Sequence, residues 1–159
     1  MLLTLAFKMH KKTVIVDLDG TLALNKHRAH YIDKKQRSKV DWNSYFLACD
    51  KDSPNQAVIK SVNALKAQGY RVHIFSARGD IAKDITINWL KKHNVHYDVL
   101  TMREMDTYTP DEVLKRFWVL DFYPNYKNDV LCVFDDRDKV VKMWRELGLT
   151  CFQVAEGNF

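Results

Sequence analysis

The sequence lacks the features that mark several large classes of protein. It contains no run of about 18 consecutive apolar residues, the length that a membrane-spanning helix needs, so no membrane partner is expected. Cysteine occurs only at Cys49, Cys132 and Cys151, and these spacings match no common metal-binding pattern. Cys132 and Cys151 lie in apolar runs, which predicts reduced core residues of a cytosolic protein.

Internal repeats, low-complexity tracts and linkers rich in proline and glycine are also absent. A chain of 159 residues with 47% hydrophobic and 28% charged residues is therefore expected to form one globular domain, 1–159. Its opening, MLLTLAFKMHKK, is apolar and then basic, the reverse of the order in a secretory signal. These features predict a cytoplasmic protein, and no feature predicts an oligomeric state.

Positive charge is concentrated in one segment. The net charge is +5, which favours an acidic or phosphorylated partner. Basic residues cluster in KHRAHYIDKKQRSKVDW, residues 26–42, with Tyr31 and Trp42 among them. Two interpretations of this segment stay open: a solvated surface loop, and a surface that contacts phosphates.

Strand and helix patterns alternate along the chain. The predicted strands are residues 13–17, 71–77, 97–102, 129–136 and 150–155. The predicted helices are residues 53–70, 80–92, 109–118 and 137–148, with Ser53 and Thr109 as N-caps. The last helix is expected to point Val140, Val141, Trp144 and Leu147 inward. This alternation is typical of an α/β fold with a central parallel sheet flanked by helices.

Residues 23–52 interrupt the alternation. They follow the first strand, so we expect a small insert that projects over the sheet edge where that strand ends. The predicted core is then residues 10–22 and 53–159. Ligands of such sheets bind outside the carboxyl ends of the strands, which places this insert beside the expected site.

Polar residues follow three of the predicted strands. Asp17 and Asp19 end the first strand, in DLDGT, and Asp135 and Asp136 end the fourth, in FDDRD. Four carboxylates at one edge repel one another unless a cation lies among them. Oxygen ligands select a hard ion, and Mg²⁺ above all.

Other residues of the chain can hold phosphate oxygens. Ser76 and Arg78 follow the second strand, and Lys115 lies on the third helix. Together with Mg²⁺ they suggest phosphoryl transfer, in which one carboxylate can act as the nucleophile and a second can handle the proton. In DLDGT the glycine permits a tight turn, and Thr21 offers a hydroxyl to the phosphate.

The order of these motifs resembles that of a known family. DLDGT, FSAR, Lys115 and FDDRD match the four motifs of the haloacid dehalogenase (HAD) superfamily of phosphohydrolases. Within it, the tail FDDRDKVVKMWRELGLTCFQVAEGNF resembles the 3′-phosphatase domain of phage polynucleotide kinase–phosphatase. DLDGTLALNKHR, which contains Arg28, and PDEVLK, which contains Asp111, resemble other parts of the same domain.

The resemblance implies a role for each residue. Asp17 would be the nucleophile, Asp19 the general acid and base, and Lys115 a catalytic ligand of the phosphate. The implied Mg²⁺ ligands are Asp17, the backbone carbonyl of Asp19, and Asp135 or Asp136. The implied contacts to substrate or phosphate come from Thr21, Arg28, Ser76, Ala77, Arg78 and Asp111, the last of which would orient Lys115.

The resemblance also implies a Rossmann-like core, a small cap at 23–52 and an open site. The expected reaction is removal of a 3′-phosphate from a polynucleotide end through an aspartyl-phosphate, in a cytoplasmic protein that a phage could encode. A nucleotidase for nucleoside monophosphates is the main alternative. A phosphorylated switch module and an inactive nucleic-acid-binding protein are further ones, which Asp19 and the complete set of motifs disfavour. No Gly-x-x-x-x-Gly-Lys-Ser/Thr loop occurs, so kinase activity is not expected of this chain.

Overall fold

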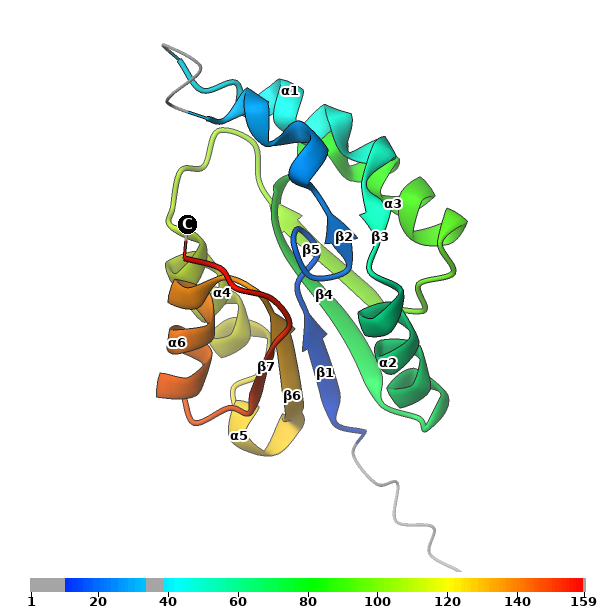
Figure 1. Cartoon of the computed structure of the whole chain (residues 1–159). Helices are drawn as coiled ribbons and strands as arrows, with labels where there is room; N and C mark the ends of the chain where they lie inside the picture. Colours follow the sequence, from blue (N-terminus) through cyan, green and yellow to red (C-terminus); the bar gives the residue numbers. More distant parts are fainter. Residues whose placement is uncertain (1–10, 34–38, 159) are drawn as a thin grey trace, which may run out of the picture.

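Five parallel strands form the central sheet of the computed structural model, which describes residues 11–33 and 39–158. The strand order is β5-β4-β1-β6-β7, and each neighbouring pair is parallel (Figure 1). The strands are β1 (Thr13–Val16), β4 (Arg71–Gly79), β5 (Val99–Arg103), β6 (Val130–Asp135) and β7 (Cys151–Gln153). The predicted α/β fold with a central parallel sheet is confirmed.

Helices cover both faces of this sheet. Figure 1 shows α2 (Gln56–Ala67) and α3 (Lys83–Lys92) on one side of it, and α4 (Asp111–Phe122) and α6 (Asp138–Glu146) on the other. The short helix α5 (Tyr126–Asp129) leads directly into β6. Because β1 lies between β4 and β6, its carboxyl end is the point where the strand order reverses, and this is where such sheets bind ligands.

Two apolar clusters join the sheet to the helices. Because successive side chains of a strand point to opposite faces, Val14 and Val16 contribute to one cluster and Ile15 to the other. The first cluster also contains Val58, Ile59, Val62, Trp89 and Leu90 from α2 and α3. The second contains Trp118, Val119, Val140, Val141, Trp144 and Leu147 from the region of α4 and α6. Strand β1 is therefore buried on both faces, which fixes the start of the turn that follows it.

The two predicted helix caps are wrong in detail. Ser53 belongs to β3 (Ser53–Pro54), and α2 begins at Gln56 after Asn55. Ser53 is drawn into a short antiparallel ladder with Leu24, and this pairing outweighs its preference for a cap. Helix α4 begins at Asp111, so Pro110 rather than Thr109 is the N-cap residue, and it makes no side-chain cap hydrogen bond.

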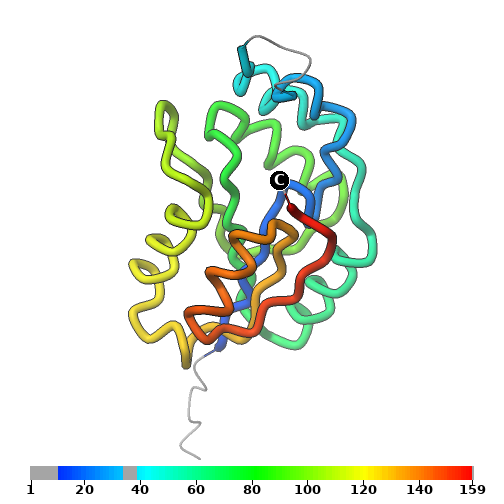
Figure 2. The backbone as a smooth tube through the Cα atoms, turned by 60° about the vertical axis from the view of Figure 1, so that its left-hand side comes forward, coloured from blue at the N-terminus to red at the C-terminus, as the bar shows by residue number. Residues whose placement is uncertain are grey.

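Over its described residues, 23–33 and 39–52, the predicted insert contains only short elements. These are β2 (Ala23–Leu24), the 3₁₀ turn η1 (Lys26–Tyr31), α1 (Trp42–Leu47) and the 3₁₀ turn η2 (Ala48–Lys51). Figures 1 and 2 both place residues 23–33 and 39–51 at the end of the sheet where β1 and β4 end. Lys34, Lys35 and Arg37 of the predicted basic surface lie outside the described residues.

Two further expectations concern cysteine and membranes. Cys132 and Cys151 are buried and unpaired, as predicted, and so is Cys49. Within residues 11–33 and 39–158, no helix has both the length and the apolar character that a membrane crossing requires.

Candidate active site

The turn after β1 places Asp17 and Asp19 at the carboxyl edge of the sheet. Gly20 has a φ of +87°, and a Cβ atom at this position would lie 2.1 Å from Oδ2 of Asp136. Only glycine therefore allows the turn to pass so close to the end of β6. The Thr21 hydroxyl donates a hydrogen bond to Oδ1 of Asp136 at 3.3 Å, so it braces this carboxylate in addition to its predicted phosphate role.

Three buried carboxylates form a cluster at this edge. One oxygen each of Asp17, Asp135 and Asp136 lies within 4.8 Å of the other two. The Lys115 ammonium donates hydrogen bonds to Asp17 at 2.6 Å and to Asp135 at 2.8 Å. The structure thus brings together four residues from three separate segments of the sequence, as predicted.

Lys115 reaches this cluster because α4 packs against the sheet. Lys115, Trp118 and Val119 form the buried side of the helix. Lys115 is only 2% exposed, so its ammonium has little contact with water and depends on the two carboxylates for compensation. The Asp17 and Asp135 contacts therefore fix both the side chain and the helix that presents it.

Asp135 is held by groups that follow it in the chain. Its Oδ1 accepts hydrogen bonds from the backbone N–H groups of Asp136, at 3.0 Å, and Arg137, at 3.3 Å. Its Oδ2 accepts a hydrogen bond from the indole N–H of Trp144 at 3.2 Å, in addition to that from Lys115. Its four donors leave Asp135 little freedom to turn.

The carboxylate cluster is short of positive charge. Burial raises the pKa of Asp17 well above its ordinary value; Lys115 opposes this shift, and Asp135 and Asp136 add to it. Burial, and next the charge of Asp135, raise the pKa of Asp136 to about 6. Burial alone would lower the pKa of Lys115, but Asp135 and Asp17 outweigh it and raise this pKa. One ammonium faces three acids, so the site favours an additional cation.

Asp19 lies in the opposite electrostatic environment. The Nη2 atoms of Arg28 and Arg78 both donate to its Oδ1, and Nε of Arg78 donates to its Oδ2 at 3.3 Å. Burial alone would raise the pKa of Asp19, but the guanidinium groups of Arg78 and Arg28 hold it below the ordinary value. The turn after β1 therefore presents one acid to a carboxylate cluster and the other to a pair of arginines.

Both arginines are buried, and both contact a third acid. Arg28 donates to Asp52 through Nε at 2.7 Å and Nη2 at 2.6 Å, and Arg78 donates to it through Nη2 at 3.0 Å. Arg28 is fully buried, although the sequence placed it in a basic segment that was expected at the surface or facing phosphates. Its guanidinium also lies over the Tyr45 ring, 4.2 Å from the centroid.

The end of β4 supplies the remaining predicted phosphate contacts. Ser76 is buried, and its hydroxyl oxygen accepts a hydrogen bond from the backbone N–H of Arg78 at 3.2 Å. The Ala77 carbonyl accepts a hydrogen bond from Nε of Arg103 at 3.0 Å. Strand β4 continues to Gly79, two residues beyond its predicted end, so these residues lie in the last part of the strand.

Asp111 has other partners than the one predicted. It was expected to orient Lys115, but its carboxylate instead accepts hydrogen bonds from Arg103, at 2.7 Å, and Arg137, at 2.6 Å. Lys115 bonds to Asp17 and Asp135, as described above. Asp111 therefore braces the start of α4 against β5 and the loop after β6.

Three residues of the site were missed from the sequence. Arg103 ends β5, and applying the strand-end rule to this strand too would have found it. Trp144 was predicted as a core residue, which is correct, but its N–H also holds Asp135. Asp52 has no local signal, because its partners Arg28 and Arg78 lie 24 and 26 residues away.

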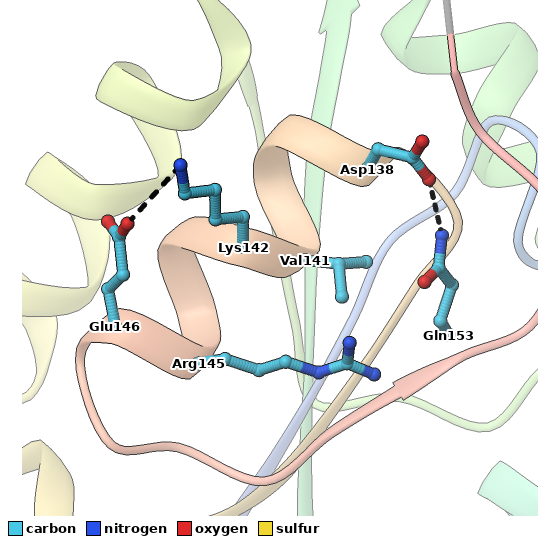
Figure 3. Close-up of a pocket in the computed structure, with 6 residues that line it drawn as sticks. All are labelled: Asp138, Val141, Lys142, Arg145, Glu146 and Gln153. Atoms are coloured by element: carbon cyan, nitrogen blue, oxygen red, sulfur yellow. Dashed lines mark hydrogen bonds and ion pairs between the residues drawn. The ribbon is translucent and has the colours of Figure 1, made fainter.

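A separate hollow lies beside α6 and Gln153 of β7 (Figure 3). It is lined by Asp138, Val141, Lys142, Arg145, Glu146 and Gln153. Gln153 donates to Asp138 at 2.7 Å, and Lys142 pairs with Glu146 at 3.9 Å. None of these residues belongs to the predicted site.

Comparisons with known proteins agree with this geometry. Residues 11–159 match the family model described as "Polynucleotide kinase PNKP phosphatase domain". The chain is 33% identical over 150 residues to the "Putative bifunctional polynucleotide kinase/RNA ligase" of Autographa californica nuclear polyhedrosis virus. That match covers 91% of this chain but only 19% of the viral protein.

The chain is also similar to several solved structures. The chain is 35% identical, with a TM-score of 0.79, to a chain in "Structure of the Pnkp1/Rnl/Hen1 RNA repair complex", covering 96% of this chain and 45% of that one. A second structure of this complex gives a TM-score of 0.81 at the same identity, with 48% of its chain covered. The chain also shares the fold of the structure titled "1.7 Angstrom Resolution Crystal Structure of Putative Phosphatase from Clostridium difficile", at 13% identity and a TM-score of 0.67, covering 92% of this chain and 86% of that one.

The chain thus spans less than half the length of the relatives that it resembles at 33–35% identity. The family match, in contrast, covers nearly the whole of this chain and every residue of the described site. The chain belongs to the polynucleotide kinase phosphatase-domain family of the HAD superfamily and is an HAD-type phosphatase.

Proposed function

We propose that this protein is a Mg²⁺-dependent phosphomonoesterase that removes 3′-phosphates from polynucleotide ends through an aspartyl-phosphate on Asp17. The observation that carries the proposal is the position of Asp17, within the carboxylate cluster and 2.6 Å from the Lys115 ammonium. An ammonium beside the nucleophile can also neutralise the phosphate that the nucleophile attacks.

The carboxylate cluster fits Mg²⁺. Its donor atoms are oxygens, which this hard cation prefers, and it lacks the positive charge to balance three buried acids. Asp17, Asp135 and Asp136 would hold the ion, together with the backbone carbonyl of Asp19. When bound, Mg²⁺ supplies positive charge that stabilises the phosphate oxygens during transfer.

The first chemical step belongs to Asp17 and Asp19. A carboxylate oxygen of Asp17 attacks phosphorus, the bond from phosphorus to O3′ breaks, and the Asp19 carboxyl gives its proton to O3′. Lys115 and Ser76 would hold the oxygens of the transferring phosphate. The guanidinium groups of Arg78 and Arg28 outweigh burial and lower the pKa of Asp19, so a bound phosphate that shares their positive charge with Asp19 favours the protonated form.

The second step reverses the role of Asp19. Its carboxylate takes a proton from a water molecule, whose oxygen attacks phosphorus. The bond between phosphorus and Asp17 breaks, and inorganic phosphate leaves. The ordinary state of Asp19 suits this step, because its low pKa keeps it ionised near neutral pH.

The family and the insert both favour a large substrate with a phosphorylated end. The relatives named for polynucleotide kinase and RNA repair support a nucleic-acid end as substrate. We propose that residues 23–52 act as a small cap that leaves the site open to such an end. The viral relative also supports an origin in a virus or phage. We propose that the protein acts in the host cytoplasm.

The test is phosphate release from a 3′-phosphorylated oligonucleotide with Mg²⁺ and with EDTA, beside a panel of free nucleoside monophosphates. We expect release from the oligonucleotide with Mg²⁺ only, and none from the Asp17→Asn variant. Release from free nucleotides alone would replace the proposal with a nucleotidase. A stable phosphorylated protein without turnover would replace it with a phosphorylated switch.

A further inference from the structure

Asp52 is a buried acid to which neither the motifs nor the proposed mechanism gives a role. It follows η2 at the end of the insert and is 3% exposed. Its carboxylate accepts three hydrogen bonds from guanidinium groups, two from Arg28 and one from Arg78, at 2.6 to 3.0 Å. Nε2 of His27 lies 2.9 Å from the same carboxylate, at Oδ1.

The two arginines link Asp52 to Asp19. Nη2 of Arg28 and Nη2 of Arg78 each contact Oδ1 of Asp19 and Oδ2 of Asp52. The four side chains therefore form a closed ring in which two carboxylates alternate with two guanidinium groups. Any rotation of one guanidinium changes its contacts with both acids.

Charge explains why the second acid is needed. Two buried guanidinium groups that share one oxygen repel each other, and Asp19 alone cannot compensate both while it exchanges a proton. The paired contact of Asp52 with Nε and Nη2 fixes the plane of the Arg28 guanidinium. The Asp52 carbonyl accepts a hydrogen bond from the Trp89 indole at 2.8 Å, which anchors this acid to α3.

We propose that Asp52 is a positioning residue: it holds Arg28 and Arg78 in the orientation that aims Asp19 at the leaving oxygen. The inference rests on the proposed function, in which Asp19 gives a proton to O3′. It also gives the insert a part in the chemistry, because Arg28 and Asp52 both come from it.

The proposal predicts a selective defect that depends on the leaving group. An alkoxide leaves slowly unless it receives a proton, whereas a thiolate leaves without one. Two oligonucleotides of one sequence supply the comparison: one with an ordinary 3′-phosphate, and one with sulfur in place of O3′. In the second, the bond between phosphorus and sulfur breaks and the thiolate departs unprotonated, while all other contacts are shared.

The experiment measures kcat/KM of the wild type and Asp52→Asn on both oligonucleotides. kcat/KM reports only the steps up to departure of the leaving group, so the later hydrolysis does not enter. For Asp52→Asn we expect a loss of about 10- to 100-fold on the oxygen substrate and less than about 3-fold on the sulfur substrate. Equal losses on the two substrates, or no loss on either, would overturn the proposal.

Two variants guard against a trivial result. Asp50→Asn removes an exposed acid from the preceding turn and should leave both activities unchanged. Asp52→Glu keeps the charge and displaces it by one methylene, so it should show a weaker form of the same selective loss even if Asp52→Asn does not fold. Circular dichroism and thermal unfolding establish that each variant is folded; an equal loss for a folded Asp52→Glu would also overturn the proposal.

Failure of the proposed function has a different signature. The wild-type protein would then release phosphate from neither oligonucleotide. The same variants would be compared on benzyl phosphate, which has an alkoxide leaving group, and on p-nitrophenyl phosphate, whose leaving group needs no proton. A selective loss on benzyl phosphate would support the role of Asp52 on another substrate, and equal losses would reject it.

Discussion

Asp17 and Asp19 are separated by one residue, yet their carboxylates lie in opposite electrostatic environments. Asp17 shares a buried cluster with Asp135 and Asp136, and burial raises its pKa. Asp19 contacts two guanidinium groups, which outweigh burial and lower its pKa. The two sides differ in origin too, since core strands and α4 build the first, and the insert contributes half of the second.

Two aspartates in one turn, Asp17 and Asp19, are thus expected to have different roles. Asp17 is expected to act as a nucleophile beside a cation and a lysine. Asp19 is expected to exchange a proton while arginines control its charge. In an extended strand, residues two apart point to the same face, so the turn after β1 is what separates these two side chains. The partners that each side chain then contacts decide its role.

The largest effect is expected when the two acids are exchanged for amides one at a time. Asp17→Asn removes the nucleophile, so kcat/KM for a 3′-phosphorylated oligonucleotide should fall by at least about 10⁴-fold. Asp19→Asn should lower it by roughly 10²- to 10⁴-fold, because only the proton transfer is lost. Steady-state phosphate release measures both, and a milder defect for Asp17→Asn than for Asp19→Asn would reverse the assigned roles.

Replacing Lys115 should lower the free energy of unfolding, because the carboxylate cluster then lacks its ammonium. Lys115→Met leaves Asp17 and Asp135 buried without their ammonium, so the free energy of unfolding in EDTA should fall by about 3 to 5 kcal/mol. Urea unfolding followed by circular dichroism measures this change.

The matched control is Lys142→Met on α6. The Lys142 side chain is 78% exposed and lies 3.9 Å from Glu146, so its loss should leave the free energy of unfolding almost unchanged. Similar effects of the two substitutions would mean that the buried contacts of Lys115 contribute little.

The pH dependence should identify the acid that lacks compensation. The pKa of Asp136 is raised to about 6 from 3.8, so between these values the folded protein keeps a proton that the unfolded chain has released. Stability of the metal-free protein should therefore fall as pH rises through this window, by roughly 3 kcal/mol.

Asp136→Asn should remove the part of that loss that Asp136 causes, while Asp17, whose pKa burial also raises, keeps its own contribution. The variant is expected to be more stable than the wild type in EDTA at pH 7.5, and the difference should vanish near pH 4. Thermal unfolding across this pH range measures the difference in stability. Asp121→Asn, which changes an exposed acid, is the control. A less stable variant at pH 7.5 would show that Asp136 is already compensated without a metal.

The smallest effect is stabilisation by Mg²⁺ itself. A tenfold excess over the dissociation constant should add about 1.4 kcal/mol to the free energy of unfolding. Asp136→Asn should reduce this gain in the free energy of unfolding. Asp52→Asn should keep it, because Asp52 contacts Arg28 and Arg78 and does not belong to the carboxylate cluster. Thermal shift with Mg²⁺ against EDTA measures both variants, and an equal loss of the gain would contradict the separation of the two sides.

The sequence predicted the carboxylate cluster and Lys115 better than the ring formed by Asp19, Arg28, Arg78 and Asp52. Asp17, Asp135 and Lys115 lie at strand ends or on a core-facing helix, so periodicity and the parallel-sheet rule bring them together. Arg28 was found only through a resemblance, and its burial was not expected. Asp52 was missed, since its partners are set by how residues 23–52 fold back on the core, and no local pattern records that path.

The prediction of Ser53 as a helix N-cap was wrong for a related reason. Ser53 has the side chain of a good N-cap, but pairing with Leu24 places it in a strand. Such tertiary contacts override a local preference that is worth about 1 kcal/mol. The elements themselves were predicted because each has several apolar residues at the spacing that its own geometry requires.

The measurement that tests the two roles most directly is a rapid-quench reaction of Asp19→Asn with the sulfur-bridged oligonucleotide. The thiolate needs no proton, so we expect a fast burst of thiol equal to the enzyme concentration. Phosphate should then appear slowly, because hydrolysis of the Asp17 phosphate needs Asp19 as base. Thiol and phosphate released together from the first turnover, or the same burst from Asp17→Asn, would contradict the roles proposed for Asp17 and Asp19.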